Sequence, residues 1–563
     1  MSKLLELKSC ATARDVALLI GFQPKALGFV AWGTTSRYST FDIPKRSGGK
    51  RTIHAPMPQL KLAQRKLSDL LQECEKEIEA SLGVKQRLSH GFRIDHSILT
   101  NADVHRNQKY VLNFDLEDFF GTINFGRVRG FFISNRHFRL APDVATLIAQ
   151  IACHESKLPQ GAPTSPVISN LIANILDMRL VKLARSHGCS YSRYADDITF
   201  STSKPEFPIE IAVQNSPNSW SLSNTVESAV KASAFKINPS KTRMLYRRSR
   251  QDVTGIVVNK VVNVNSDYRR DVRVMVHNLC STGSFHRRKA VLGADGNTEI
   301  QKENGSRPQL QGMISFIQQV EEFGRYGATL PSKLRAIEKI NQRFLFYTRF
   351  AAPDAPMLVF EGKTDSVYLN SAIKRLAPAY PSLASSTGLH IQLLRQTKTM
   401  ERLFGLSGGA NPLMTFIKNY HDEYRKVQGP KGKFPVIAVF DNDSVASGVI
   451  KLISGIKKIT LPHGTQVVRV FDNFYVMLTT PFGGPSHCIE DFFDPTFVKS
   501  ALGGKTINFT SKANGPNEVS KSYFAEQIVH PQWKTINFDG FKPLLDQIVK
   551  TIAGHVSSYA TGP

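Results

Sequence analysis

Three aspartates beside predicted strands are the residues of this chain best suited to chemistry. Asp115 ends an apolar run over residues 110–115, and Asp196 and Asp197 form an acidic turn within residues 190–202. Carboxylates gathered at one place hold divalent metal ions such as Mg²⁺, and a pair of such ions activates a hydroxyl group and neutralises a leaving phosphate. The three residues therefore predict a two-metal site for phosphoryl transfer.

The segments around these aspartates must bring them together. Residues 190–202 predict two short strands around a tight turn, because Tyr, Ile, Thr and Phe flank the acidic pair and Asp tolerates the backbone angles of a turn. Residues 110–115 are mostly apolar, as in a buried strand. We expect adjacent strands of one sheet, with the three carboxylates at their ends.

Two further segments carry groups suited to binding a phosphate-bearing substrate. A turn rich in Gly and Pro at residues 160–166 opens a stretch of helical spacing at residues 167–180. Residues 41–56 predict a basic hairpin around Gly48 and Gly49, suited to gripping a triphosphate. The cations of this hairpin are Lys45, Lys50 and Arg51. Taken singly, the first segment is more typical of an ordinary capped helix and the second of a solvated hairpin.

In this order and spacing, the segments resemble the reverse transcriptase family over about residues 30–340. The resemblance implies a right-hand fold of fingers, palm and thumb. It also implies that Asp115, Asp196 and Asp197 bind the two Mg²⁺ ions of an RNA-directed DNA polymerase. Phe120 matches the family's sugar gate, whose ring would clash with a ribose 2′-OH and favour deoxynucleotides.

The same resemblance implies contacts with the incoming deoxynucleoside triphosphate. Lys45 and Arg51 match triphosphate-contacting positions, and Gln160 matches a residue that lines the nucleotide pocket. Lys241 matches a lysine after the palm helix, which either assists the departure of pyrophosphate or is a surface lysine. Phe119, the neighbour of the sugar gate, is predicted to belong to the core.

Two short signatures narrow the resemblance to retron reverse transcriptases. Residues 101–105 fit an Asn-Ala-x-x-His signature that ends at His105, and residues 253–255 fit a Val-Thr-Gly signature. By itself, His105 is typical of a hydrogen-bonded structural histidine. The resemblance implies a bacterial enzyme that copies a structured cognate RNA, starting from a guanosine 2′-OH, into a branched RNA–DNA product. It further implies a role in defence against phage.

A second group of acids follows predicted strands in the second half of the chain. Glu361 follows one apolar run, and Asp441 and Asp443 follow another. Acids at the carboxyl ends of neighbouring parallel strands form a crevice site in an open α/β sheet. Together with Asp365, this arrangement resembles the Toprim domain, and Glu490 resembles an acidic position of the nuclease branch of that domain.

The Toprim resemblance implies an α/β domain with a mainly parallel sheet and one or two bound Mg²⁺ ions. Glu361 would act as general base or metal ligand, and Asp365, Asp441, Asp443 and Glu490 would complete the metal site. Whether the substrate of this effector is DNA or RNA stays open. Each acidic cluster alone is also typical of an exposed helix face or a capping turn.

Composition favours a polyanionic partner. The chain has 72 Lys and Arg against 46 Asp and Glu, a formal net charge of +26. Such an excess favours nucleic acid and makes binding sensitive to salt. Basic clusters between residues 243 and 289 predict a track for RNA or a hybrid duplex, or a solvated charged face. Tyr246, Tyr268 and Phe285 lie among these charges and are candidates for stacking on bases.

A chain of 563 residues is too long for one core, and its patterns predict four parts. They are a helical lead-in at residues 1–30, fingers and palm at 31–261, thumb and linker at 262–350, and the Toprim-like part at 351–563. Within the thumb, residues 281–308 are rich in Gly, Ser, Asn and charge, which predicts a mobile loop.

Other features predict a cytoplasmic bacterial enzyme. The six cysteines form no close pair and predict no zinc module, and the amino-terminal residues lack the apolar core of a secretory signal. The sequence contains no uninterrupted run of 18 apolar residues, so we expect no membrane span. Homo-oligomerisation would suit a toxic effector that the protein itself restrains, but no sequence pattern indicates a number of subunits. Two alternatives stay open: another defence or intron-derived reverse transcriptase, or an RNA–DNA scaffold whose Toprim part binds without cutting.

Overall fold

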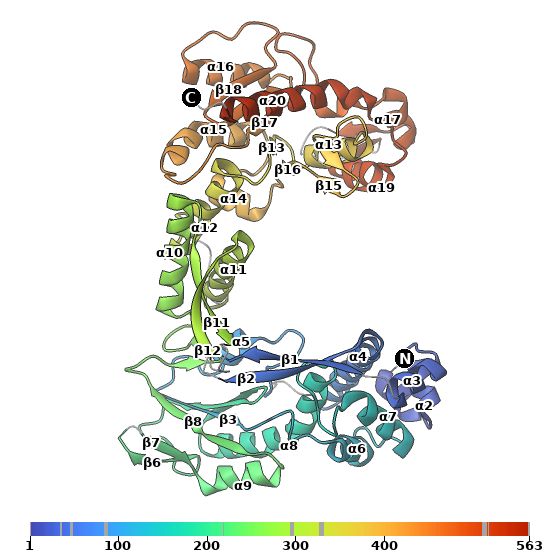
Figure 1. Ribbon diagram of the computed structural model, residues 1–563, viewed down its shortest axis with the longest axis vertical. Coiled ribbons are helices and arrows are strands. Elements are labelled where there is room, and N and C mark those ends of the chain that lie inside the picture. The colour runs from blue at the N-terminus through green and yellow to red at the C-terminus, as the bar shows by residue number, and fades with distance from the viewer. Residues whose placement is uncertain are drawn as a thin grey trace. The chain divides into compact units, whose positions relative to one another are not determined.

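The chain divides into two compact units (Figure 1). The computed structural model describes residues 2–33, 37–45, 49–83, 88–217, 219–292, 298–325, 331–508, 515 and 517–560. The first unit comprises Met1–Arg270, Arg288–Glu303 and Phe316–Thr329, and the second comprises Asp271–Arg287, Asn304–Ser315 and Leu330–Pro563. Both units mix helices with strands.

Four helices and a hairpin open the described part of the first unit. The helices begin at capping residues or at proline: α1 (Lys3–Ser9), α2 (Ala13–Leu19), α3 (Pro24–Trp32) and α4 (Pro58–Ser81). Between α3 and α4, strands β1 (Tyr38–Pro44) and β2 (Lys50–Pro56) pair antiparallel. The predicted basic hairpin is confirmed, and Gly48 in its turn lies outside the described residues.

A four-stranded antiparallel sheet forms the centre of the first unit, in the order β4-β5-β3-β8. Its strands are β3 (Tyr110–Leu116), β4 (Ser190–Tyr194), β5 (Asp197–Thr202) and β8 (Ile237–Tyr246). The apolar run before Asp115 forms β3 as predicted, and the two strands around the acidic turn are β4 and β5. Strands β3 and β5 are neighbours, so the expected adjacency is confirmed.

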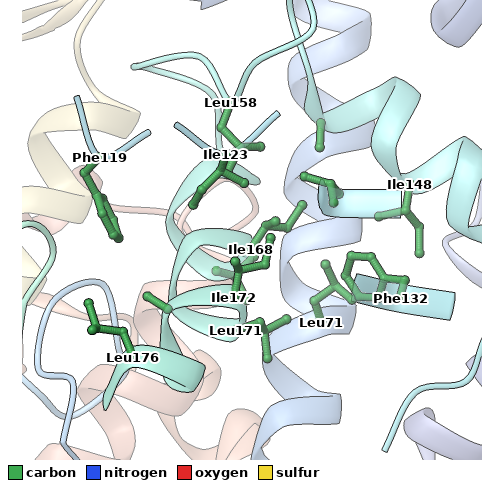
Figure 2. Close-up of a cluster of buried hydrophobic side chains, with 14 of the residues drawn as sticks. Leu71, Phe119, Ile123, Phe132, Ile148, Leu158, Ile168, Leu171, Ile172 and Leu176 are labelled. Atoms are coloured by element: carbon green, nitrogen blue, oxygen red, sulfur yellow. The ribbon is translucent and has the colours of Figure 1, made fainter. Parts of the chain in front are cut away.

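Five helices accompany this sheet: α5 (Ile98–Asp103), α6 (Phe125–Ser134), α7 (Pro142–Ala152), α8 (Ser165–Ser186) and α9 (Asn224–Ala232). Helix α8 contains the stretch that helical spacing predicted. Apolar side chains of α4, α6, α7 and α8 meet in one core, and Figure 2 shows Leu71, Phe132, Ile148, Ile168 and Ile172 within it. Each of these side chains is at most 1% exposed, and burying such a side chain contributes about 1.5–3 kcal/mol.

Smaller elements follow along the chain. They are the hairpin of β6 (Ala212–Ser216) and β7 (Ser219–Leu222), the hairpin of β9 (Asp252–Val253) and β10 (Ile256–Val257), and the helices α10 (Ser266–Thr282), α11 (Arg307–Phe323) and α12 (Ala336–Phe346). The predicted loop at residues 281–308 is wrong, because β11 (His286–Leu292) and β12 (Thr298–Asn304) pair there. The Gly and Asn residues that suggested a loop are concentrated at residues 293–297, outside the described ranges.

The prediction that Phe285 stacks on a base is also wrong. Its side chain is only 2% exposed, and a Cβ atom on Gly305 would lie 2.0 Å from its ring. Phe285 therefore packs inside the protein, where the glycine makes room for it. The charges on either side of Phe285 in the sequence gave no indication of this burial.

A five-stranded sheet forms the second unit, in the order β16-β13-β17-β19-β18. Its strands are β13 (Met357–Phe360), β16 (Gln392–Leu393), β17 (Val436–Phe440), β18 (Val467–Phe471) and β19 (Phe474–Leu478). All neighbouring pairs are parallel except β18 with β19. Strands β13 and β17 are buried throughout, as parallel strands covered on both faces usually are. The mainly parallel sheet agrees with the prediction for this part of the chain.

Helices and short strands surround this sheet. The helices are α13 (Asp365–Arg375), α14 (Lys398–Phe404), α15 (Ala410–Arg425), α16 (Ala446–Lys457), α17 (Pro495–Ala501), α18 (Lys521–Tyr523), α19 (His530–Gln532) and α20 (Lys542–Ala560). The strands are β14 (Ala384–Ser385), β15 (Gly388–Leu389), β20 (Thr506–Asn508) and β21 (Glu518–Ser520). Among the helices in the described ranges, none has the length and apolar character needed to cross a membrane.

A buried ion pair anchors β4 to α8 in the first unit. The guanidinium of Arg193 is fully buried and donates to both carboxylate oxygens of Asp177 at 2.7 Å. Tyr191 donates a further hydrogen bond to the same carboxylate, also at 2.7 Å. Because Arg193 immediately precedes Tyr194 and the acidic turn, this pair fixes the strand that leads into the turn.

We predict that Asp177→Ala strongly destabilises the first unit. The substitution leaves the Arg193 guanidinium buried without its counter-charge, which costs about 3–5 kcal/mol in comparable sites. Scanning calorimetry would detect this as a large fall in the unfolding temperature. The matched control is Glu206→Ala, an exposed acid whose loss changes stability by less than about 0.5 kcal/mol. Equal effects of the two substitutions would contradict the anchoring role.

Candidate functional site

The structure places Asp115, Asp196 and Asp197 at the meeting ends of three strands. Asp115 lies opposite Asp197 across β3 and β5, and Asp196 lies between β4 and β5 in the acidic turn, residues 194–197. Ala195 in this turn has φ +56°, a conformation uncommon for residues other than glycine. The amide of Leu116 donates to the carbonyl of Asp196 at 3.0 Å, which ties the turn to the end of β3.

The three carboxylates influence one another electrostatically. Burial raises the pKa of Asp196, and the charge of Asp115 raises it further. Asp197 is exposed at the surface of the turn, yet surrounding protein atoms, the charge of Asp196 and contact with Asp115 raise its pKa. Lys241 on β8 donates to Asp115 Oδ2 at 2.6 Å, and this bond raises the pKa of Lys241. The lysine therefore offsets part of the concentrated negative charge.

The donor chemistry of this site fits Mg²⁺. Aspartate oxygens are hard ligands of the kind that Mg²⁺ prefers. Burial raises the pKa of Asp196 and of Asp197, and neighbouring carboxylates raise both pKa values further, so a bound cation would relieve this cost. Within the described parts of the chain, no three His, Cys, Asp or Glu side chains converge closely enough to form a complete metal-binding cluster. One carboxylate oxygen of Asp115 accepts a hydrogen bond from Lys241.

The residues predicted to bind a nucleotide come from separate elements of the first unit: the hairpin, the segment before α8, and β8. Lys45 and Arg51 are exposed on the hairpin, and the charge of Arg51 opposes part of the rise in the pKa of Asp196. The hairpin contacts a second turn, the Gly- and Pro-rich segment at residues 160–166. The amide of His54 donates to the Gln160 carbonyl of that segment at 2.9 Å. Gly161 has φ +115°, and a Cβ atom there would lie 3.0 Å from the His54 carbonyl oxygen. Glycine therefore permits this close approach.

Phe120 and Phe119 have different environments. Phe119 is 3% exposed and stacks on Phe235 with ring centroids 5.5 Å apart, so its predicted place in the core is confirmed. Phe120 is half-buried and meets the edge of Phe119 at 5.3 Å. Its assignment as a sugar gate stays a prediction.

The Asn-Ala-x-x-His signature connects to the strands that bear the aspartates. His105 is fully buried, with Nδ1 2.7 Å from Ser201 Oγ and Nε2 2.8 Å from Ser192 Oγ. Ser192 in turn donates to Asn101 at 2.7 Å. Burial lowers the pKa of His105 to about 3, so the imidazole is neutral near pH 7. The histidine thus joins β4 to β5 and has a structural role.

The Val-Thr-Gly signature forms the tight turn between β9 and β10. Thr254 has φ +49° and Gly255 has φ +79°, as in the type I′ turns of two-residue hairpins. The Thr254 hydroxyl donates to the carbonyl of Ile98, the first residue of α5, at 3.4 Å. Because Asn101 also lies on α5, the two signatures are neighbours in space although about 150 residues separate them in the sequence.

The second unit gathers its acids at the ends of β13 and β17. Glu361 and Asp441 each follow directly after one of these parallel strands. Asp365 begins α13 and accepts from the Gly362 amide at 2.7 Å. Asp441 accepts from the amide of Ile489 at 2.9 Å, which brings the short 3-10 helix Ile489–Phe492 and its Glu490 to the site.

These acids raise one another's pKa values, as carboxylates that lie close together do. Burial raises the pKa of Glu361 to about 7, with further contributions from Asp443 and Asp365. Burial raises the pKa of Asp441 to about 8, helped by Asp365, Glu490 and Glu361. Glu361 Oε2 and Glu490 Oε1 are buried without a hydrogen-bond partner. Such buried acceptor oxygens fit a site for a divalent cation.

Lys521 is a member of this cluster that sequence reasoning missed. It begins α18, and its Nζ lies 3.1 Å from Glu490 Oε2. No motif surrounds it, and the polar stretch in which it lies carried no signal. By contrast, Asp443 accepts from the Val445 amide at 2.8 Å and so takes part in a local turn as well as interacting with Glu361.

Comparison with known proteins finds a family match within the first unit. Residues 43–258 match the family described as reverse transcriptase (RNA-dependent DNA polymerase). The chain is 35% identical over 332 residues to the retron Mx162 reverse transcriptase of Myxococcus xanthus, which covers 54% of this chain and 63% of that protein. It is 32% identical over 268 residues to the retron Ec86 reverse transcriptase of Escherichia coli, covering 47% of this chain and 77% of that protein.

The fold and the acidic turn thus define a protein of the reverse transcriptase class. More particularly, the chain belongs to the family of retron reverse transcriptases. It spans less than two thirds of the Mx162 protein. A solved telomerase from Candida albicans in complex with a telomeric RNA fragment covers 70% of this chain and 66% of its own, at 10% identity and a TM-score of 0.31. That likeness is too low to carry an argument.

We predict that Asp441→Asn stabilises the metal-free protein at alkaline pH. The pKa of Asp441 is about 8 in the folded protein and about 4 in the unfolded chain. Between these pH values the carboxyl group is ionised in the unfolded chain and takes up a proton on folding. Wild-type stability therefore falls as pH rises from about 4 to 8, and the amide removes this term. In EDTA, the unfolding temperature of the variant should exceed that of the wild type by an amount that grows from pH 5 to pH 8.5. Each kcal/mol of added free energy of unfolding corresponds to about 2–4 °C.

The control for this experiment is Asp422→Asn, which changes an exposed aspartate on α15. Its effect on the unfolding temperature should be the same at both pH values. If the Asp441 variant gave a gain that did not depend on pH, the electrostatic account of the cluster would be wrong.

Proposed function

We propose that this chain is an RNA-directed DNA polymerase, with Asp115, Asp196 and Asp197 as its catalytic residues. The observation that carries the proposal is the register of β3 and β5, which sets Asp115 opposite Asp197 with Asp196 in the adjoining turn. Bound at these carboxylates, Mg²⁺ would activate the primer hydroxyl and neutralise the leaving pyrophosphate. The carboxylates would hold these ions at the end of β3 and in the acidic turn.

Other residues of the first unit would select and orient the incoming deoxynucleotide. Lys45 and Arg51 are exposed cations on the hairpin and suit the triphosphate, while Gln160 lines the turn that contacts that hairpin. Phe120 would exclude the ribose 2′-OH. Lys241, which is bonded to Asp115, would supply positive charge as pyrophosphate departs.

We further propose that the template is a structured cognate RNA and that the product is a branched RNA–DNA hybrid. Membership of the retron family and the two neighbouring signatures support this assignment. A groove of about 420 Å³ in the second unit supports a polyanionic partner, because the cations Arg273, Lys339 and Arg343 line it, with His277 and three apolar side chains, and no acid lines it. Cations arranged in this way suit a phosphate backbone.

The second unit is proposed to be a Toprim-like nuclease that acts as an effector in antiviral defence. Its support is the meeting of acids at the ends of parallel strands, together with the buried partnerless oxygens of Glu361 and Glu490. Glu361, Asp365, Asp441, Asp443 and Glu490 would hold Mg²⁺. The four-part organisation, with divisions near residues 30, 261 and 350, belongs to the same proposal.

We predict that Asp197→Asn abolishes DNA synthesis while the fold is kept. Loss of one metal-binding carboxylate removes several kcal/mol of transition-state stabilisation, which corresponds to a rate lower by about a thousandfold or more. The measurement is the DNA attached to RNA after expression with the native flanking DNA, analysed with and without RNase and debranching enzyme.

The matched control for this test is Glu117→Gln, because Glu117 is an exposed acid two residues beyond Asp115. It should yield the wild-type product, a single short DNA whose mobility shifts after both treatments. Undiminished synthesis by the Asp197 variant would refute the polymerase site. Heterogeneous RNA without a discrete branched DNA, in the wild type, would refute the retron product.

We predict that Glu361→Gln abolishes Mg²⁺-dependent cleavage and leaves DNA synthesis intact. The substitution keeps the size of the side chain and removes the negative charge at the second site. Single-stranded and duplex DNA and RNA, offered separately, would report cleavage, and Glu401→Gln supplies an exposed control on α14. Equal cleavage by both variants would exclude a nuclease at Glu361, and cleavage by neither wild type nor variants would favour a binding scaffold.

A further inference from the structure

Residues 88–92 run beside β4 and end next to the acidic turn. The amide of Arg193 donates to the carbonyl of Leu88 at 2.9 Å, and the amide of His90 donates to the carbonyl of Arg193 at 2.8 Å. These bonds make a parallel bridge between Ser89 and Arg193. The segment is therefore fixed to the strand that leads into the turn.

Gly91 brings the same segment into close backbone contact with the acidic turn. A Cβ atom at Gly91 would lie 2.7 Å from the amide nitrogen of Ala195, so only glycine fits without a shift. The side-chain amide of buried Asn170 donates to the Gly91 carbonyl at 2.8 Å. The position of the following residue, Phe92, is consequently fixed relative to the acidic turn.

Phe92 combines exposure with an unusual backbone conformation. Its φ is +61°, a region that bulky residues rarely adopt, and its side chain is 44% exposed. Its ring centroid lies 6.1 Å from that of Phe120 and 6.5 Å from that of Tyr194. Neither the conformation nor the exposed ring favours stability, and strained positions held by their surroundings occur preferentially at functional sites.

The ring of Phe120 has aromatic neighbours of two kinds. Buried Phe119 meets it at 5.3 Å, and exposed Phe92 meets it at 6.1 Å. Aromatic rings attract one another at these separations. Phe119 is fixed by the core, and Phe92 gives the Phe120 ring a second aromatic contact, from a side chain that is 44% exposed.

We propose that Phe92 is a positioning residue of the sugar gate, which holds the Phe120 ring where it excludes a ribose 2′-OH. The inference rests on the proposed function, in which the chain is a polymerase and Phe120 is the gate. Phe92 acts through Phe120 and takes part in no bond-making step. It therefore contributes to the choice between deoxynucleotides and ribonucleotides rather than to the rate with the correct substrate.

The test measures kcat and KM of the full chain for dATP and for ATP, in single-nucleotide extension of a DNA primer on an RNA template with Mg²⁺. Phe92→Ala should lower the preference for dATP about three- to tenfold, the range expected for one aromatic pair, with kcat for dATP within about twofold of wild type. Phe92→Tyr keeps the ring and should restore the preference. Phe29→Ala removes an exposed phenylalanine elsewhere, on α3, and should change nothing.

A double-substitution comparison separates positioning from direct contact. Phe120→Ala should lower the preference more than Phe92→Ala does, and adding Phe92→Ala to it should have no further effect, because the residue acts through the missing ring. An additive effect, or an equal loss of dATP and ATP incorporation, would overturn the proposal. Phe92→Leu gives the same comparison if the alanine variant unfolds. Absence of dATP incorporation by the wild type would instead overturn the proposed polymerase and this inference with it.

Discussion

Pairing between β3 and β5 underlies the architecture of the first unit. It sets Asp115 opposite Asp197, and the mutual repulsion of the carboxylates opposes that arrangement. The polar interior compensates: the Arg193–Asp177 pair anchors β4, and His105 joins β4 to β5. These bonds are buried, where the low dielectric strengthens them and makes a lost partner costly. These buried bonds therefore hold the two strands that flank the acidic turn.

The second unit concentrates acids by a different geometry. Parallel strands end at the same edge of a sheet, so Glu361 and Asp441 meet although no hairpin joins β13 to β17. Segments much farther along the chain add Glu490 and Lys521. In the first unit a lysine bonded to Asp115 offsets the charge, and in the second Lys521 has the corresponding position beside Glu490. Both sites thus place hard oxygen donors at strand ends with one nearby ammonium group.

Sequence reasoning succeeded where a pattern is local and strong. Apolar runs that end on Asp115 and Glu361, and the turn-forming acidic pair at Asp196, each lie within a few residues, so the strands and the turn were predictable. It failed at Phe285, because surrounding charges suggested exposure whereas a glycine 20 residues away makes room for the ring. The hairpin of β11 and β12 was missed because its turn-forming composition masked the two flanking strands.

Local patterns were enough to show that strands end on acids, that a basic hairpin precedes them, and that two retron signatures are present, because side-chain chemistry and hydrophobic spacing act over short distances. Only folding brought together residues that lie far apart in the chain: the α5 signature with the Thr254 turn, Lys521 with Glu490, and Phe92 with Phe120. Such pairs depend on strand register and on packing between elements. A local sequence pattern specifies neither the register nor the packing, because both depend on contacts throughout the core.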